Sequence, residues 1–218
     1  MTPSVSSDNA TAVLRTQDVM QCLDEHGLQA IFELPHVSSC LLILDTGADA
    51  SLKKKDIGPF SDKKIGRTIH AIRYAPIPVA GILVSPAGDV CMGLFFACHF
   101  RFAVSSICLG FTSRQSLFFQ MMGQEIQQDR SLPNALAQGA TMPANDALRQ
   151  GLIQGVAAAA AIENHALEYV QGIVSGKRKK VITSVMTAVH ASRTLDIDEA
   201  LAVETRLFCD LAKAKNHE

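Results

Sequence analysis

Two short, uninterrupted apolar runs mark the first half of the chain. One covers residues 39–44 (SCLLIL) and the other residues 79–84 (VAGILV). A continuous apolar run of this length is typical of a strand that is buried on both faces, as in a parallel sheet between helices. Residues 100–104 and 107–111 are two further strand candidates. Together these segments predict a central sheet.

Helical periodicity fills the spaces between these strands. Apolar positions recur at helical spacing over residues 11–31 and again over residues 63–74, where Pro76 and Pro78 end the pattern. Residues 90–98 predict a buried helix. Because strands and helices alternate, the first half indicates an α/β domain with parallel strand pairing, preceded by a loose tail over residues 1–10.

The second half of the chain has a helical pattern. Residues 144–150 follow Pro143, a residue suited to a helix start, and precede Gly151, a residue suited to a helix end. An alanine-rich stretch from residue 156 continues this pattern to residue 174. The final helix is expected to begin at an N-terminal cap formed by Asp196 and Glu199.

Charge and hydropathy exclude several classes of partner. The chain has 20 basic and 21 acidic residues, which is not the clustered basic excess of a nucleic-acid binder. No apolar run reaches the length of a membrane span, and the polar first residues are unlike a secretory signal. We therefore expect a cytoplasmic protein without membrane contact. The basic run at residues 177–180 favours a solvated patch beside a helix, with contact to a phosphate-bearing ligand as the alternative.

The cysteines and histidines show no metal-binding pattern. The six cysteines contain no CxxC pair, and the seven histidines are scattered without ligand spacing. We therefore expect neither a metal site nor a bound cofactor.

Three segments, taken in order, carry a resemblance to a known family. They are LLILDTGAD (residues 41–49), PVAGILVSPAGDVCMGLFFACHFRFA (residues 78–103) and LAQGATMPANDALRQGLIQGV (residues 136–156). Their spacing of proline, alanine, glycine and leucine resembles that of the crotonase (enoyl-CoA hydratase/isomerase) superfamily. The closing segment ALAVETRLF is similar to the last helix of that family.

The resemblance implies a crotonase-like α/β spiral with shortened N-terminal strands. It assigns residues 1–160 to this core and residues 161–218 to a C-terminal helical region for oligomerisation, with a homotrimer or hexamer expected. It also implies an acyl thioester as substrate, carried by coenzyme A or by an acyl carrier protein. In such proteins two backbone amides hold the thioester oxygen while an enolate forms. Position by position, those amides belong to Ala48 and Val90, beside the substrate-binding positions Asp49 and Gly93.

The chain departs from the family pattern at its catalytic positions. The two glutamates of the hydratases fall at Gly93 and Ser113, which cannot move a proton as a carboxylate does. The usual glycine triplet is replaced by Asp89, Val90 and Cys91, and a β-branched valine restricts the backbone dihedrals that glycine allows. The two-glutamate mechanism is therefore disfavoured.

Other polar residues are candidates for the chemistry. We predict catalytic roles for His99, Asp89 and Ser113. The alternatives are a structural histidine at a helix end, a turn aspartate beside Gly88, and, for Asp49, a helix cap. The resemblance therefore favours a divergent lyase, isomerase or decarboxylase, such as the members that act in polyketide biosynthesis. The alternative is a catalytically silent subunit that binds an active homologue.

Overall fold

The computed structural model describes residues 4–5, 11–16, 19, 25–45, 59–110 and 141–215. In this part of the chain a six-stranded sheet has the order β1-β2-β3-β4-β5-β8. Its first pair, β1–β2, is antiparallel, and all the other pairs are parallel. The strands are β1 (Ser4–Val5), β2 (Thr11–Arg15), β3 (Ser39–Leu44), β4 (Val79–Leu83), β5 (Phe100–Val104) and β8 (Gly155–Ala157). A small antiparallel pair is formed by β6 (Cys108–Leu109) and β7 (Met142–Pro143).

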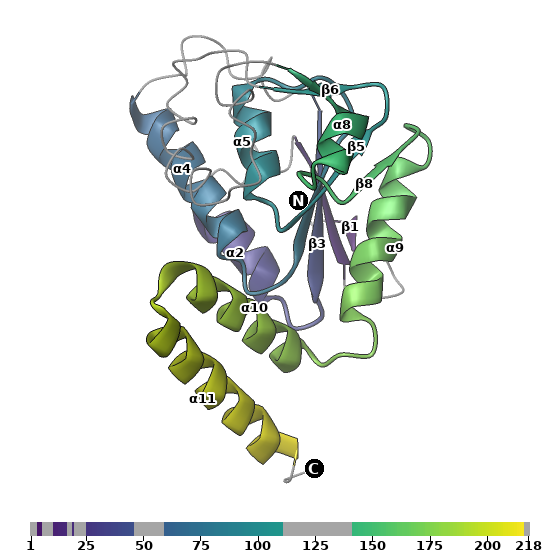
Figure 1. The fold of residues 1–218 in the computed structure, drawn as a ribbon. Helices are drawn as coiled ribbons and strands as arrows, with labels where there is room; N and C mark the ends of the chain where they lie inside the picture. The colour runs from purple at the N-terminus through teal and green to yellow at the C-terminus, as the bar shows by residue number, and fades with distance from the viewer. Residues whose placement is uncertain are drawn as a thin grey trace.

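Helices cover both sides of this sheet. Figure 1 shows α2, α4 and α5 on one side and α9 on the other. This double cover explains the continuous apolar runs, because every residue of β3 and β4 is buried. The helices are α2 (Glu25–Glu33), α4 (Pro59–Arg73), α5 (Asp89–Ala97), α8 (Ala144–Arg149), α9 (Ile162–Val174), α10 (Lys179–Thr194) and α11 (Ile197–Lys215). None of the described helices is long and apolar enough to cross a membrane.

The predictions with the strongest local signal are confirmed. The two apolar runs form β3 and β4, and residues 100–104 form β5. Helix α4 begins at Pro59, earlier than expected, because proline suits the first turn of a helix. Gly151 ends α8 with φ 74°. The Asp196 carboxylate accepts the Glu199 amide at 2.9 Å, as the capping pattern predicted.

The helix predicted over residues 11–31 is wrong for its first part. Residues 11–15 form β2, which pairs in parallel with residues 39–43 of β3, and α2 begins only at Glu25. Pairing with a buried neighbouring strand outweighs the helical spacing of the apolar residues, and β-branched Thr11 and Val13 suit a strand. Ser4 and Val5, expected in a loose tail, pair with β2. The N-terminal strands are therefore present and short.

The alanine-rich stretch also differs from its prediction. Gly155–Ala157 forms β8 beside β5, and α9 begins at Ile162 rather than at residue 156. The backbone amide and carbonyl of Arg101 in β5 bind Gln154 through its side-chain oxygen and its amide, each at 2.7 Å. Residues 155–157 therefore form a strand of the sheet, although alanine by itself favours a helix.

Gly155 is expected to be intolerant of a side chain. A Cβ at this position would lie 2.7 Å from Phe102 Cδ1 and 2.6 Å from His165 Nε2. We expect Gly155→Ala to lower the free energy of unfolding by about 1–3 kcal/mol, because the packed side chains must shift. Gly172→Ala, on α9 with no atom within 4 Å of its Cβ, is the matched control. It should raise stability by about 0.5–1 kcal/mol. Urea denaturation of both variants tests this, and equal effects would contradict it.

The last two helices lie apart from the main core. Ile162, Ala166 and Val170 of α9 belong to the central hydrophobic cluster, whereas Ile182 and Met186 of α10 form a separate cluster with Val174. Figure 1 shows α10 and α11 below the sheet, with α11 outermost. The helical region predicted from residue 161 therefore contains one core helix, α9, and a protruding pair.

The basic run at residues 177–180 flanks the start of α10. Lys179 donates to the backbone carbonyls of Phe32 at 2.8 Å and Leu34 at 2.5 Å, at the end of α2. Lys177 donates to the carbonyl of Ile173. The two bonds of Lys179 attach α10 to the body of the domain, whereas the bond of Lys177 caps the end of α9. Lys179 therefore has a structural role.

Candidate functional site

The candidate site lies at the carboxyl edge of the parallel strands. Because β3, β4 and β5 run in parallel, their last residues meet at one edge, where Asp45 follows β3 and Val84 follows β4. Helix α5 begins at the same edge with Asp89, near the top of the view in Figure 1. This edge of a parallel sheet is the usual place for a ligand site in α/β folds.

The first turn of α5 presents backbone amides at this edge. Gly88 caps the helix with extended dihedrals (φ −79°, ψ 179°), and its carbonyl accepts the Met92 amide at 3.0 Å. Val90 is therefore the second residue of the helix, a position whose amide has no acceptor within the helix itself. Such an amide, with the helix dipole behind it, suits a developing negative charge.

The replaced glycine triplet is compatible with this backbone. Asp89, Val90 and Cys91 all lie within α5. Helical dihedrals are open to every L-residue, so the restriction predicted for a β-branched valine does not apply at Val90. The Val90 side chain is 8% exposed and packs into the core. Asp89 is half-buried in the first helical turn, where an acidic side chain stabilises a helix.

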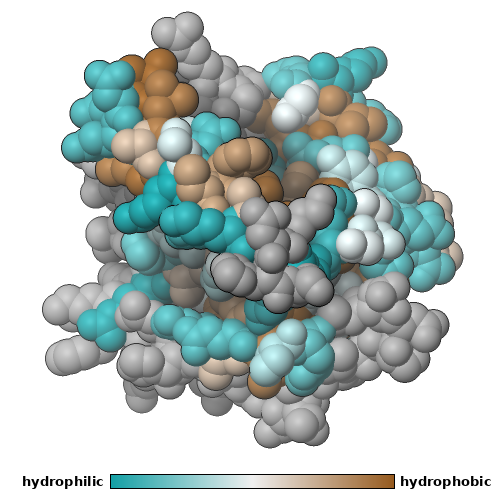
Figure 2. Space-filling view, turned by 90° about the horizontal axis from the view of Figure 1, so that it is seen from below, coloured by the Kyte–Doolittle hydropathy of each residue, from teal (hydrophilic) through white to brown (hydrophobic). Residues whose placement is uncertain are grey.

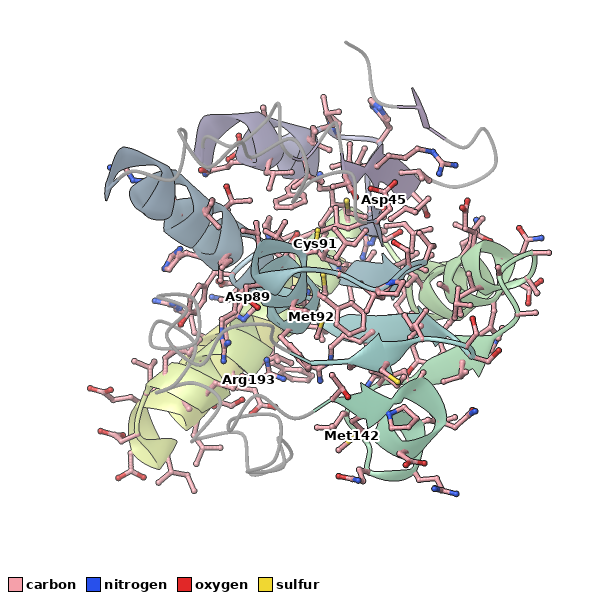
Figure 3. The ribbon with its side chains drawn as sticks, turned by 90° about the horizontal axis from the view of Figure 1, so that it is seen from above. Asp45, Asp89, Cys91, Met92, Met142 and Arg193 are labelled. Atoms are coloured by element: carbon pink, nitrogen blue, oxygen red, sulfur yellow. The ribbon has the colours of Figure 1, made fainter. Side chains whose placement is uncertain are left out.

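Hydrogen bonds join the end of β3 to the start of α5. The Thr16 hydroxyl donates to the Ile43 carbonyl at 3.0 Å and accepts the Asp45 amide at 2.8 Å. The Cys91 thiol donates to the Asp45 carbonyl at 3.3 Å. Figure 3, which looks from above onto the start of α5, shows Cys91 between Asp45 on one side and Asp89 on the other. Sequence reasoning did not select Thr16 or Cys91, since a single threonine or cysteine carries no motif.

His99 lies at the other edge of the sheet. It stands between the end of α5 and the start of β5, so the nine-residue helix α5 separates it from Asp89. At 1.5 Å per residue this separation is about 15 Å. Both ring nitrogens bind the backbone: Nδ1 accepts the Val79 amide and Nε2 lies 3.1 Å from the Arg73 carbonyl. This geometry supports the structural alternative for His99.

Burial holds His99 in its neutral form. Desolvation lowers its pKa to about 3, and nearby His190, Arg193 and Arg73 act in the same direction, against the opposing effect of the Arg73 carbonyl. Since Nδ1 accepts an amide hydrogen, Nε2 carries the ring proton and donates it to the backbone carbonyl of Arg73. Both ring nitrogens of neutral His99 are held in hydrogen bonds with the backbone. His99 is therefore not placed to transfer a proton to or from a ligand at the opposite edge of the sheet.

The other predicted site residues fall into two groups. Gly93 is buried in the middle of α5, on the same helix as Asp89 and Val90. Ala48, Asp49 and Ser113 lie outside the described residues. Of the seven predicted site residues, the structure thus brings Asp89, Val90 and Gly93 together on one helix.

Burial favours the thiol form of Cys40 and Cys98. Burial raises the pKa of Cys98 to about 12, and it also raises the pKa of Cys40. Neither is a nucleophile in this state, because the thiolate is the reactive form. Among the described residues, no group of three histidine, cysteine or acidic side chains is placed to hold a metal ion. The described residues place two kinds of polar group at this edge: the backbone amides of the first turn of α5 and the half-buried carboxylate of Asp89.

Solved structures share this fold. No protein-family model and no curated sequence matches the chain. An enoyl-CoA hydratase from Bacillus anthracis superposes with a TM-score of 0.74 at 16% identity, over 95% of this chain and 90% of that chain. DspI from Pseudomonas aeruginosa gives 0.78 at 15% identity, over 97% and 96%. An enoyl-CoA hydratase from a Polaromonas species gives 0.70 at 18%, over 95% and 90%. The chain therefore has the fold of the crotonase (enoyl-CoA hydratase/isomerase) superfamily.

Proposed function

We propose that this protein binds an acyl thioester and stabilises its enolate form at the first turn of α5. The acyl group is carried by coenzyme A or by an acyl carrier protein. The observation that carries the proposal is the place of Val90: its amide lies at the carboxyl edge of the sheet, in the fold of enoyl-CoA hydratases. Ala48, with its neighbour Asp49, is proposed as the second donor segment.

The reaction class follows from the missing carboxylates. Addition of water to a double bond by two glutamates is disfavoured, because Gly93 and Ser113 occupy their positions. A lyase, isomerase or decarboxylase that works through an enolate needs the oxygen contacts above all. Asp89, which begins α5 beside Val90, is proposed for proton transfer together with Ser113. We also propose a role in polyketide biosynthesis and a cytoplasmic location.

Proton exchange tests this proposal without knowledge of the natural substrate. Butyryl-coenzyme A and a butyryl-carrier protein are incubated with the enzyme in heavy water, and loss of the signal of the protons next to the carbonyl is followed by NMR. Enolate formation predicts exchange that depends on the enzyme, and calorimetry should show binding of the same thioesters. A panel of thioesters that neither bind nor exchange would refute the proposal.

A second candidate function is a catalytically silent subunit. The buried Gly93 in place of a glutamate favours it, since the fold is kept where the carboxylate is lost. This function predicts a stable complex with an active enoyl-CoA hydratase, whose turnover changes when this chain is added. A homogeneous oligomer that catalyses exchange by itself would exclude this alternative.

Self-association through α10 and α11 is proposed for either function. The two helices enclose a groove of about 390 Å³ lined by Ser184, Val185, Ala188, Val189, Ser192, Glu204, Leu207, Phe208 and Leu211. Phe208 is 71% exposed and Val185 is 54% exposed. Figure 2 shows hydrophobic side chains among hydrophilic ones on the face seen from below, towards which these helices lie. An exposed apolar area of this kind is typical of a subunit interface, here of a homotrimer or hexamer.

A positive charge introduced on the surface formed by α10 and α11 should prevent assembly of the oligomer. Because Phe208 would be buried between subunits, Phe208→Lys is expected to turn the oligomer into monomers, as measured by light scattering during size-exclusion chromatography. Leu148→Lys, at an exposed apolar position on α8, is the matched control and should leave the mass unchanged. An unaltered mass for Phe208→Lys would place the interface elsewhere.

A further inference from the structure

Thr16 and Cys91 bind the two backbone polar groups of one residue, Asp45, at the candidate site. Thr16, which directly follows β2, accepts the amide hydrogen of Asp45, and Cys91 donates its thiol hydrogen to the carbonyl of the same residue. Thr16 also donates to the Ile43 carbonyl. The hydroxyl thus acts as donor and acceptor at once.

These bonds connect three elements in sequence. They lead from the end of β2, through the end of β3, to the first turn of α5. Both side chains are buried, with relative exposure of 0%. The bond from Thr16 to Ile43 is buried and the two bonds to Asp45 are part-buried, and each limits the distance between the elements that it joins. We call Thr16, Asp45 and Cys91 the β3–α5 relay.

The relay determines the orientation of the helix start. Cys91 is the residue after Val90, and both belong to one rigid turn of α5. Attachment of the Cys91 thiol to Asp45 therefore limits rotation of this turn about the helix axis, and with it the direction of the Val90 amide. Stabilisation of an oxyanion depends steeply on the placement of its donors, so a change of a fraction of an ångström matters.

We infer that Thr16 and Cys91 are positioning residues that orient the first turn of α5 toward the thioester oxygen. This inference rests on the proposed function and deepens it. Neither side chain touches the substrate, since both are buried. Replacement of either residue should reduce the polarisation of the thioester carbonyl. It should leave the affinity for the coenzyme A part unchanged.

Infrared spectroscopy of a bound thioester tests the inference. Butyryl-coenzyme A, isotopically labelled at its carbonyl, is bound to the full chain and the carbonyl stretching frequency is recorded. Hydrogen bonds to the oxygen move this band to lower frequency. We expect a shifted band in the wild type, loss of most of the shift in Thr16→Val, and recovery in Thr16→Ser, which restores the hydroxyl. Affinity for coenzyme A, measured by calorimetry, should stay within about twofold of wild type.

Thr11→Val is the matched control for the loss of a buried hydroxyl. Thr11 begins β2 at the opposite edge of the sheet, is equally buried, and bonds the Ser39 hydroxyl at 2.8 Å. It should keep the shifted band. Should Thr16→Val fail to fold, Cys91→Ala breaks the relay at its other end and is expected to lose the shift as well.

The outcomes separate this inference from the proposed function. A wild-type band without any shift overturns the proposed function and the positioning role together. A shifted wild-type band that Thr16→Val and Cys91→Ala both retain overturns the positioning role alone. Equal losses of the band shift in Thr16→Val and Thr11→Val would also overturn the positioning role, because they would reflect general destabilisation.

Discussion

Acidification from pH 7 to pH 3 is expected to lower the free energy of unfolding by about 4 kcal/mol through His99 alone. The folded protein lowers the pKa of this histidine from 6.5 to about 3, first by burial and then through His190, Arg193 and Arg73. The unfolded chain therefore binds the proton more tightly than the folded one. The stabilising contribution of neutral His99 is complete above pH 6.5 and is lost as the pH falls toward 3.

Protonation of His190 should also lower the free energy of unfolding as the pH falls. Burial lowers its pKa too, and its Nε2 lies 3.2 Å from the carbonyl of Ala75. The His99 and His190 rings lie 5.5 Å apart between centroids. Protonation of both would place two positive charges beside Arg73 and Arg193. Acid should therefore also weaken the contact of α10 with the segment after α4.

A variant that cannot be protonated at position 99 measures how much of the loss of stability in acid is due to His99. His99→Asn keeps an acceptor for the Val79 amide and cannot be protonated. We expect it to be less stable than wild type near neutral pH and to lose much less stability on acidification, as measured by urea denaturation over a pH series. His36→Gln, at an exposed histidine, is the control and should follow the wild-type curve. Full acid sensitivity in His99→Asn would assign the effect to other groups.

Removal of the Val90 amide is expected to lower the rate of thioester proton exchange by about 100-fold to 1,000-fold. Val90→Pro deletes the N–H, and a helix tolerates proline in its first turn, where the amides lack partners within the helix. The loss should appear in the exchange rate and in the carbonyl band, because both depend on donation to the thioester oxygen.

A second proline variant controls for damage to a helix start. Lys180 is the second residue of α10, as Val90 is of α5, and it lies outside the candidate site. Lys180→Pro should keep the exchange rate within about threefold of wild type. Circular dichroism verifies that both variants are folded. Unchanged exchange in folded Val90→Pro would exclude this amide as the donor.

The candidate site was predictable from sequence only in outline. The run over residues 78–103 located the helix that carries Asp89, Val90 and Gly93, because its spacing follows a strand–turn–helix pattern. The same run suggested both His99 and Asp89 as catalytic residues, since sequence proximity hides the length of α5. The structure places the two at opposite edges of the sheet. Thr16 and Cys91 were not selected, because their partners lie 27 to 46 residues away.

The sequence by itself determined the central strands β3 and β4, the helices α4 and α5, and the cap of α11. These elements follow from local patterns: two-sided burial gives unbroken apolar runs, and caps bind residues within one turn. Only the tertiary structure decided that residues 11–15 and 155–157 are strands. Their patterns also suit helices, and pairing with β3 and β5 selects the extended form. The position of His99 and the β3–α5 relay were likewise decided by contacts between segments far apart in the chain.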